Sequence, residues 1–68
     1  MTEARKGDII HFRNKYYRVV TRSLVTKQVK LAPVKRKSGR YEFVLDGEPR
    51  WFSLEEVRNY ARFVASFS

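Results

Sequence analysis

Short runs in which apolar and polar residues alternate constrain the fold of this chain more than any other feature. The clearest run is YYRVVTR, residues 16–22, which is rich in aromatic and β-branched residues. Alternation with a period of two is typical of a β-strand that buries one face. One face of this strand is expected to carry Tyr17, Val19 and Thr21, and the other face Tyr16, Arg18, Val20 and Arg22.

Two further runs extend the strand pattern. IIHF, residues 9–12, follows a Gly-Asp turn signal, and the RNK sequence at 13–15 predicts a tight turn because asparagine tolerates the left-handed conformation. KQVKLAPVK, residues 27–35, predicts another strand. Pro33 has no N–H for a strand ladder, so this strand is expected to end, to bulge or to lie at an edge there.

The segment RYEFVLDGEPRWF, residues 40–52, predicts a β-hairpin. Asp46-Gly47 is a favoured two-residue hairpin turn, because both central residues of such a turn need a positive φ. A short return strand is expected from Pro49 to Phe52.

The period of the pattern changes after this hairpin. Ser53 and Glu56 have the spacing of a capping box, which predicts a helix from Leu54 to about Phe67. An apolar stripe on this helix is expected to dock on the sheet. The aromatic residues beside the stripe would cover an open barrel end or contact a partner, and they are Tyr60, Phe63 and Phe67.

Together these elements predict a mainly β (α+β) fold, in which a small, bent, antiparallel five-stranded barrel is followed by one C-terminal α-helix. The 68 residues are enough for a single small domain. Without cysteine, its stability depends on large aromatic side chains or on dimerisation. The expected boundaries are a flexible N-terminus over residues 1–6, the barrel over about 7–52 and the helix over about 54–67.

The opening Gly7-Asp8-Ile9-Ile10, the following Tyr17-Arg18-Val19 and the succession of short strands through Phe52 resemble the SH3-like small barrels, including the KOW-type and Tudor-type modules. This is a resemblance of strand pattern that covers most of the chain. Barrels of this class bind RNA, DNA or peptides. The resemblance therefore implies a binding module without choosing its ligand.

The distribution of charge points to a polyanionic partner. The chain carries 15 Lys and Arg against 7 Asp and Glu, a formal net charge of +8. Residues 1–40 hold 12 of these cations and 2 of the acids, a net charge of +10, while residues 41–68 have a net charge of −2. Such asymmetry favours a nucleic-acid ligand on one part of the surface, although solubility alone could also explain a basic protein.

Three groups of basic residues are candidates for phosphate contacts: the predicted turn and the strand behind it, the strand at 27–35, and the KRKSGR loop, for which a solvated loop is the alternative. Like charges side by side on a sheet cost stability, so a sheet that keeps them is expected to present them to phosphates. Tyr16 is expected to be exposed and to stack on a base, whereas Phe12, Tyr17 and Phe43 are expected in the core. The candidate nucleic-acid-binding residues are Arg13, Lys15, Tyr16, Arg18, Arg22, Lys30, Lys35, Arg36, Lys37 and Arg40.

The sequence thus predicts a small basic protein that binds DNA or RNA with little base-specific readout, because it has no helix-turn-helix, zinc-finger or RNP-type motif. The alternative is a protein-interaction module, or a small regulator of the kind that phages carry, which docks on a protein partner or forms a homodimer. Aromatic residues are enriched at such interfaces. The candidates for this role are Trp51, Tyr60, Phe63 and Phe67.

A catalytic role is not expected. The single histidine, His11, lies in a predicted strand, and neither a second histidine nor a cysteine is present to bind a metal with it. The three glycines lie in separate turns and form no phosphate-binding loop. We therefore expect no cofactor, no metal and no small-molecule substrate. The sequence shows no signal peptide and no apolar run near the roughly 20 residues that span a bilayer, so we expect no membrane contact and a cytoplasmic location.

Overall fold

Six strands and one short helix make up the described residues, 5–38 and 42–66, of the computed structural model. The helix is near the C-terminal end, between the last two strands. In chain order the elements are β1 (Asp8–Phe12), β2 (Lys15–Ser23), β3 (Gln28–Arg36), β4 (Phe43–Leu45), β5 (Arg50–Ser53), α1 (Leu54–Tyr60) and β6 (Arg62–Ser66).

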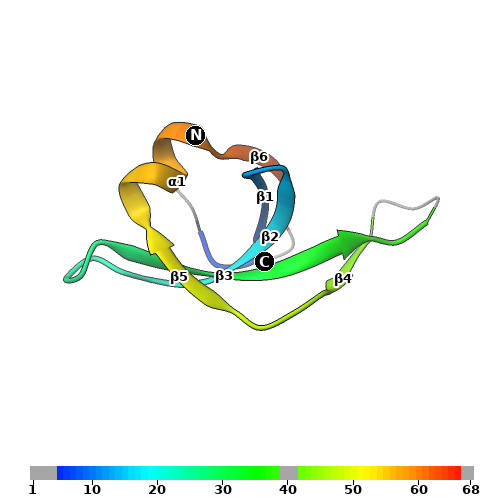
Figure 1. The fold of residues 1–68 in the computed structure, drawn as a ribbon, viewed down its shortest axis with the longest axis horizontal. Coiled ribbons are helices and arrows are strands. Elements are labelled where there is room, and N and C mark those ends of the chain that lie inside the picture. The colour runs from blue at the N-terminus through cyan, green and yellow to red at the C-terminus, as the bar shows by residue number, and fades with distance from the viewer. Residues whose placement is uncertain (1–4, 39–41, 67–68) are drawn as a thin grey trace.

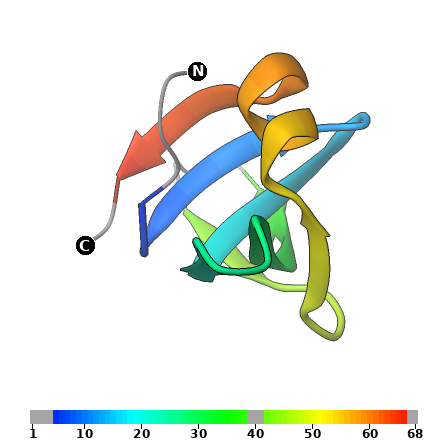
Figure 2. The same cartoon turned by 90° about the vertical axis from the view of Figure 1, so that its left-hand side faces the viewer.

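All strand pairs are antiparallel, and the sheet has the order β4-β3-β2-β1-β6, with β5 also paired to β3. β3 is therefore central, with β2 along one edge and both β4 and β5 along the other. The sheet is strongly bent, so that β1, β2 and β6 curl above β3 and α1 lies at one side of the curl (Figures 1 and 2). This arrangement confirms the predicted mainly β fold with a bent antiparallel sheet and a helix towards the C-terminus.

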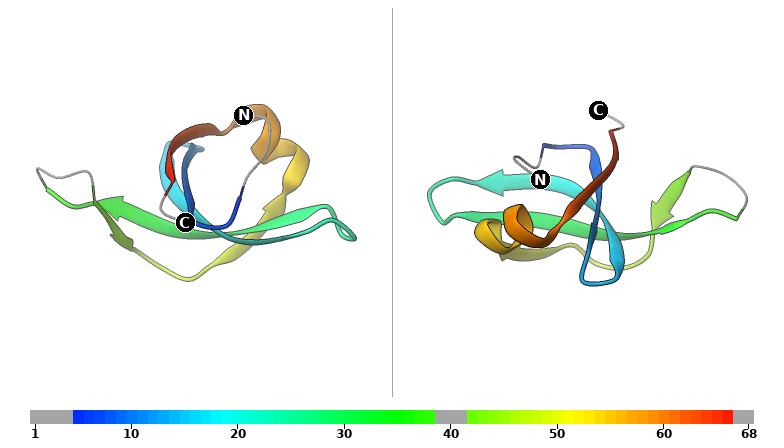
Figure 3. Two further views of the ribbon diagram at one scale, coloured as in Figure 1. Left: turned by 180° about the vertical axis from the view of Figure 1, so that it is seen from behind. Right: turned by 90° about the horizontal axis from the view of Figure 1, so that it is seen from above.

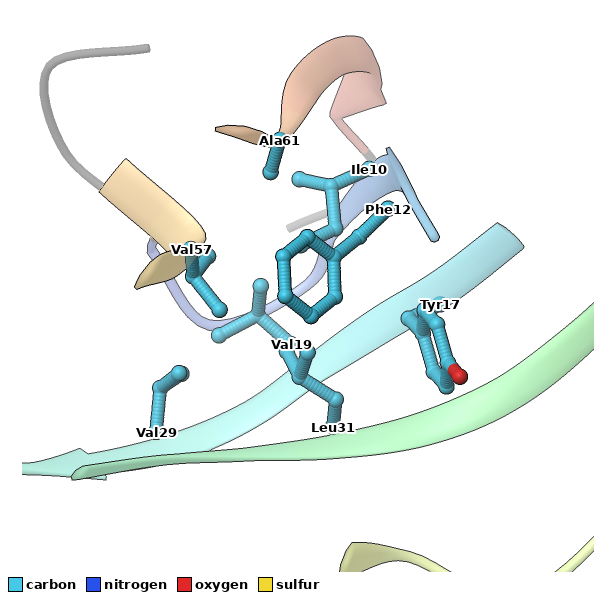
Figure 4. Packing of buried hydrophobic residues seen from close by; sticks show 8 residues of the cluster. All are labelled: Ile10, Phe12, Tyr17, Val19, Val29, Leu31, Val57 and Ala61. Atoms are coloured by element: carbon cyan, nitrogen blue, oxygen red, sulfur yellow. The ribbon is translucent and has the colours of Figure 1, made fainter. Parts of the chain in front are cut away.

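The hydrophobic core fills the inside of the curl. Two aromatic side chains at its centre, Phe12 and Tyr17, both contact Phe52, with ring centroids 5.8 and 5.4 Å away. α1 contributes Val57, Ala61 follows directly after the helix, and both of these side chains point into the same cluster (Figure 4). The buried members of the cluster are Ile10, Phe12, Tyr17, Val19, Val29, Leu31, Val57 and Ala61.

The turn between β1 and β2 has the predicted tight geometry. Arg13 and Asn14 both have positive φ, 53° and 63°, and Phe12 pairs with Lys15 across the turn. Two central residues with positive φ define the hairpin turn whose twist matches that of the strands. The structure confirms the prediction made from Asn14.

The segment between β4 and β5 does not form the predicted hairpin. β4 pairs with residues 34–36 of β3 and β5 pairs with residues 28–31, so the two short strands follow one another along the same edge of β3 (Figure 3). Between them, the Asp46 N–H donates to the Pro33 carbonyl at 2.8 Å. Pro33 has no N–H to donate along this edge of β3. The segment after β4 therefore separates from β3 beside Pro33, and β5 pairs with β3 again at residues 28–31.

Replacing Gly47 with alanine should therefore destabilise the protein by about 1–3 kcal/mol. Gly47 has a φ of +142°, and an added Cβ would lie 2.9 Å from Cγ of Pro33. Thermal unfolding followed by circular dichroism checks this prediction. The double variant Pro33→Ala/Gly47→Ala is the control, since it removes the ring and should recover part of the loss. An unchanged melting temperature in Gly47→Ala would show that the close approach is not tight.

The helix is shorter than the sequence predicts. Its start is as expected, because the Glu56 N–H donates to Oγ of Ser53 at 3.4 Å. It ends at Tyr60 rather than near residue 67, and Ala61 has an extended backbone with φ −84° and ψ 151°. Residues 62–66 then pair with β1, whose second edge would otherwise lack a partner. Backbone pairing along β1 outweighs the helical periodicity of this aromatic and β-branched segment. Within the described ranges, no helix is long and apolar enough to cross a membrane.

Candidate nucleic-acid interface

The central strands have two distinct faces. Val29 and Leu31 belong to the core. Lys30 and Ala32 alternate with them along β3 and therefore project to the opposite side, which we call the outer face. Residues directly opposite one another on paired strands share a face. The register places Arg18 opposite Ala32 and therefore on the outer face. Tyr16 and His11, which are opposite one another, continue this face onto β2 and β1.

Arg22 does not join Arg18 on this face, contrary to the sequence prediction. The register between β2 and β3 shifts between Val19 and Thr21, which leaves Val20 as an extra residue. A bulge of this kind reverses the alternation beyond it. Arg22 consequently lies opposite Val29 of the core, and only Arg18 stays on the outer face.

Three rings form an aromatic row across the outer face. Tyr16 lies in the middle, with ring centroids 5.0 Å from His11 and 5.4 Å from Phe43. Both contacts are tilted, with interplanar angles of 57° and 53°. All three residues are half-buried. The aromatic row therefore offers ring faces in several orientations rather than one flat surface.

Each end of the aromatic row carries an arginine. Arg62 lies opposite His11 on β6, and Arg36 lies opposite Phe43 on β3. Both arginines are exposed. Together with the row they line a shallow hollow of about 270 Å³, and none of the described residues that line it is acidic. The hollow thus combines ring faces with positive charge.

A basic groove adjoins the row at the end of the sheet where β1 turns into β2. It has a volume of about 550 Å³, and Tyr16 and Arg36 line both this groove and the hollow of the aromatic row. The groove also contains two acids, Asp46 and Glu48, from the segment between β4 and β5. Its cations still outnumber its acids, and they are Arg13, Lys15, Lys35, Arg36 and Arg50.

Arg13 already has partners inside the protein. Its guanidinium forms an ion pair with Glu56 of α1 and lies 4.9 Å from the Phe12 ring centroid and 5.8 Å from that of Phe52. Half or more of this side chain remains exposed, so the ion pair contributes little to stability. Arg13 links the β1–β2 turn to α1, and its charge is less available to a ligand than that of Lys15.

The remaining candidates are spread over the molecule. Lys37 is exposed, and its backbone N–H donates to the Glu42 carbonyl at 2.7 Å. Arg40 and Phe67 lie outside the described residues. Lys30 lies on the outer face beside Trp51, with its Nζ 5.8 Å from the ring centroid.

The aromatic residues of the alternative interface do not form one surface. Tyr60 ends α1 and is 75% exposed, whereas Phe63 is in β6 and Trp51 is in β5. β5 and β6 flank different strands of the sheet, β3 and β1. The single aromatic helix flank expected from the sequence is therefore absent from the described residues, because the helix ends before Phe63.

Three residues of this interface did not stand out in the sequence. His11 was expected to have no catalytic or metal-binding role, and Phe43 was expected in the core. Arg62 falls within the segment that was expected to be helical and instead lies on β6. The pairing of β1 with β6 and of β3 with β4 brings these residues to the two ends of the aromatic row.

Comparisons with protein-family models, with curated proteins and with solved structures give no match to this chain. The function must therefore be inferred from the residues of the interface.

Proposed function

We propose that this protein binds single-stranded nucleic acid, with bases stacked on the aromatic row and phosphates neutralised by the neighbouring cations. The observation that carries the proposal is the aromatic row itself, bounded by Arg36 and Arg62 at its two ends. Stacking rings beside a positively charged groove are the usual combination in proteins that bind single strands without sequence preference.

The chemistry of the row favours single strands over duplexes. Every base has a π-face, and one base stacked on an aromatic side chain stabilises a complex by about 1–3 kcal/mol. A duplex hides these faces inside its base stack and presents only phosphates, sugars and base edges. Because the rings are tilted to one another, we expect bases to stack separately on Tyr16 and Phe43 and the strand to bend between them.

The cations supply the part of the affinity that does not depend on sequence. Arg36 contributes to both the hollow and the groove, so it can hold the phosphate that connects a stacked base to the groove. Lys15 and Lys35 continue the positive charge along the groove. Release of counterions from such phosphates makes binding strongly salt-dependent.

Fluorescence anisotropy with labelled single- and double-stranded oligonucleotides over a salt series tests the proposal. We expect tighter binding of single strands and a steep negative slope of log affinity against log salt concentration, of about 0.7 per neutralised phosphate. Equal affinities for duplexes and single strands would show that base stacking does not contribute to binding. No binding at low salt would overturn the proposal.

A matched pair of variants on β2 separates outer-face contacts from net charge. Arg18→Gln should weaken binding and reduce the salt slope by about one phosphate contact, because Arg18 lies on the outer face. Arg22→Gln also removes one positive charge, but from the face of β2 opposite the outer face. Its salt slope should equal that of the wild type within error. Equal losses for both variants would mean that only net charge matters.

A further inference from the structure

Trp51 lies on the outer face, away from the aromatic row. It pairs with Lys30, and the Lys30 Nζ lies 5.8 Å from its ring centroid. The neighbouring Phe52 takes the other face of β5 and contacts the core rings of Phe12 and Tyr17. Trp51 remains 47% exposed although it is the largest apolar side chain of the protein. An exposed indole beside an ammonium group has the chemistry that recognises a base and its phosphate.

An apolar groove with a basic rim lies on the outer face between the aromatic row and Trp51. Its floor includes Ala32, opposite Arg18, and Leu45, opposite Val34. Lys6 and Arg18 supply its charged groups, and none of the described residues that line it is acidic. With a volume of about 680 Å³, the groove can accept apolar base surface while the two cations face phosphates.

The register of the strands that pair with β3 gives the distance between Tyr16 of the aromatic row and Trp51. Tyr16 is opposite Val34 of β3, and Trp51 is opposite Lys30. Four residues along a strand correspond to about 13 Å. Neighbouring phosphates of one strand are about 3.4 Å apart along the axis of a stacked duplex, and an unstacked strand is more extended, so four nucleotides or fewer span this distance. One oligonucleotide of modest length can therefore reach from the aromatic row to Trp51.

We propose that Trp51 is a second base-stacking position, and that the bound strand runs along the outer face from the aromatic row, past Arg18, to Trp51 and Lys30. This inference rests on the proposed function and adds the path of the ligand to it. It assigns Trp51 to a nucleic-acid contact rather than to the protein interface expected from the sequence. Charge selects a polyanion as the occupant, because the described residues that line the apolar groove and the hollow of the aromatic row include cations and no acids.

Intrinsic fluorescence reports directly on this position, because Trp51 is the single tryptophan of the chain. We would titrate the protein with an unlabelled oligothymidylate of about ten nucleotides, within the range of site sizes for single strands. Parallel anisotropy measurements with the labelled oligonucleotide would report total binding. We expect quenching of Trp51 fluorescence with the same midpoint as the anisotropy change.

The two measurements separate failure of this inference from failure of the proposed function. Binding by anisotropy without a change in Trp51 fluorescence would overturn the inference and leave the proposed function intact. No binding in either measurement would overturn both.

Variants of Trp51 provide an independent readout. Trp51→Ala should weaken binding of the ten-nucleotide strand about 5- to 150-fold, whereas Trp51→Phe, which keeps a ring, should recover most of the affinity. Tyr60→Ala is the matched control, since it removes an aromatic ring that is 75% exposed and lies outside the lining of the groove and the hollow. Circular dichroism confirms that each variant is folded. Equal affinities of Trp51→Ala and Tyr60→Ala would contradict the assignment.

Discussion

Replacing Phe12 with alanine should remove about a third or more of the free energy of unfolding of the protein. Phe12 is 1% exposed and contacts both Tyr17 and Phe52 at the centre of the core. Removing a buried phenyl ring costs about 3–5 kcal/mol. A domain of this size has a total stability of about 3–10 kcal/mol. Urea denaturation followed by circular dichroism measures the loss.

Phe63→Ala is the matched control for this substitution. Phe63 is 56% exposed in β6, so the same chemical change should alter the free energy of unfolding by less than about 1 kcal/mol. If both variants lost the same stability, the core would not lie inside the curl of β1, β2 and β3. A Phe12→Ala variant as stable as the wild type would contradict the fold.

Replacing Tyr16 with alanine should lower the affinity for single-stranded oligonucleotides about 5- to 150-fold. Tyr16 is the middle ring of the aromatic row and, with Arg36, lines both the hollow and the basic groove. Its loss removes one stacking face, worth about 1–3 kcal/mol, and also the support for the rings of His11 and Phe43. Fluorescence anisotropy at fixed salt measures the effect.

Tyr16→Phe separates the ring from its hydroxyl group. We expect this variant to bind within about threefold of the wild type, because stacking depends on the ring face. Tyr16 is half-buried, so its replacement can also lower the stability of the protein. The melting temperature of each variant is therefore measured, and affinities are compared at a temperature well below the lowest melting temperature. Wild-type affinity in a folded Tyr16→Ala variant would show that the aromatic row does not bind the ligand.

The alternating segments of the sequence predicted most of the fold. The strands around Tyr17 and Val29, the turn at Asn14 and the helix cap at Ser53 all follow from local chemistry, that is, from side-chain alternation, tolerance of positive φ and capping. These are short-range preferences, and nothing in the tertiary structure opposes them. The similarity to SH3-like barrels stays a prediction.

The errors arose where pairing between distant strands outweighs local preference. Asp46-Gly47 has the composition of a hairpin turn. In the structure these residues instead connect β4 to β5 along one edge of β3, beside Pro33, which has no N–H for a strand ladder. Residues 62–66 have a helical periodicity, but the open edge of β1 draws them into β6. Neither effect can be read from the segment itself.

The candidate interface was predicted in part. Tyr16, Lys15 and Arg36 were identified from charge and alternation, and the structure places them together at one end of the sheet. Arg22 was wrongly grouped with Arg18, because a bulge leaves no clear mark in a run of alternating residues. The contribution of His11 and Arg62 depends on the pairing of β1 with β6, which the expected helix had concealed.

An amide NMR titration of nitrogen-labelled protein with a single-stranded oligothymidylate tests the central claim most directly, because it locates the ligand. We predict that the largest chemical-shift changes occur at the aromatic row, at Arg36 and at Arg62, and that α1 changes little. Changes concentrated in α1, or no changes at low salt, would contradict the assignment of the outer face as a single-strand binding surface.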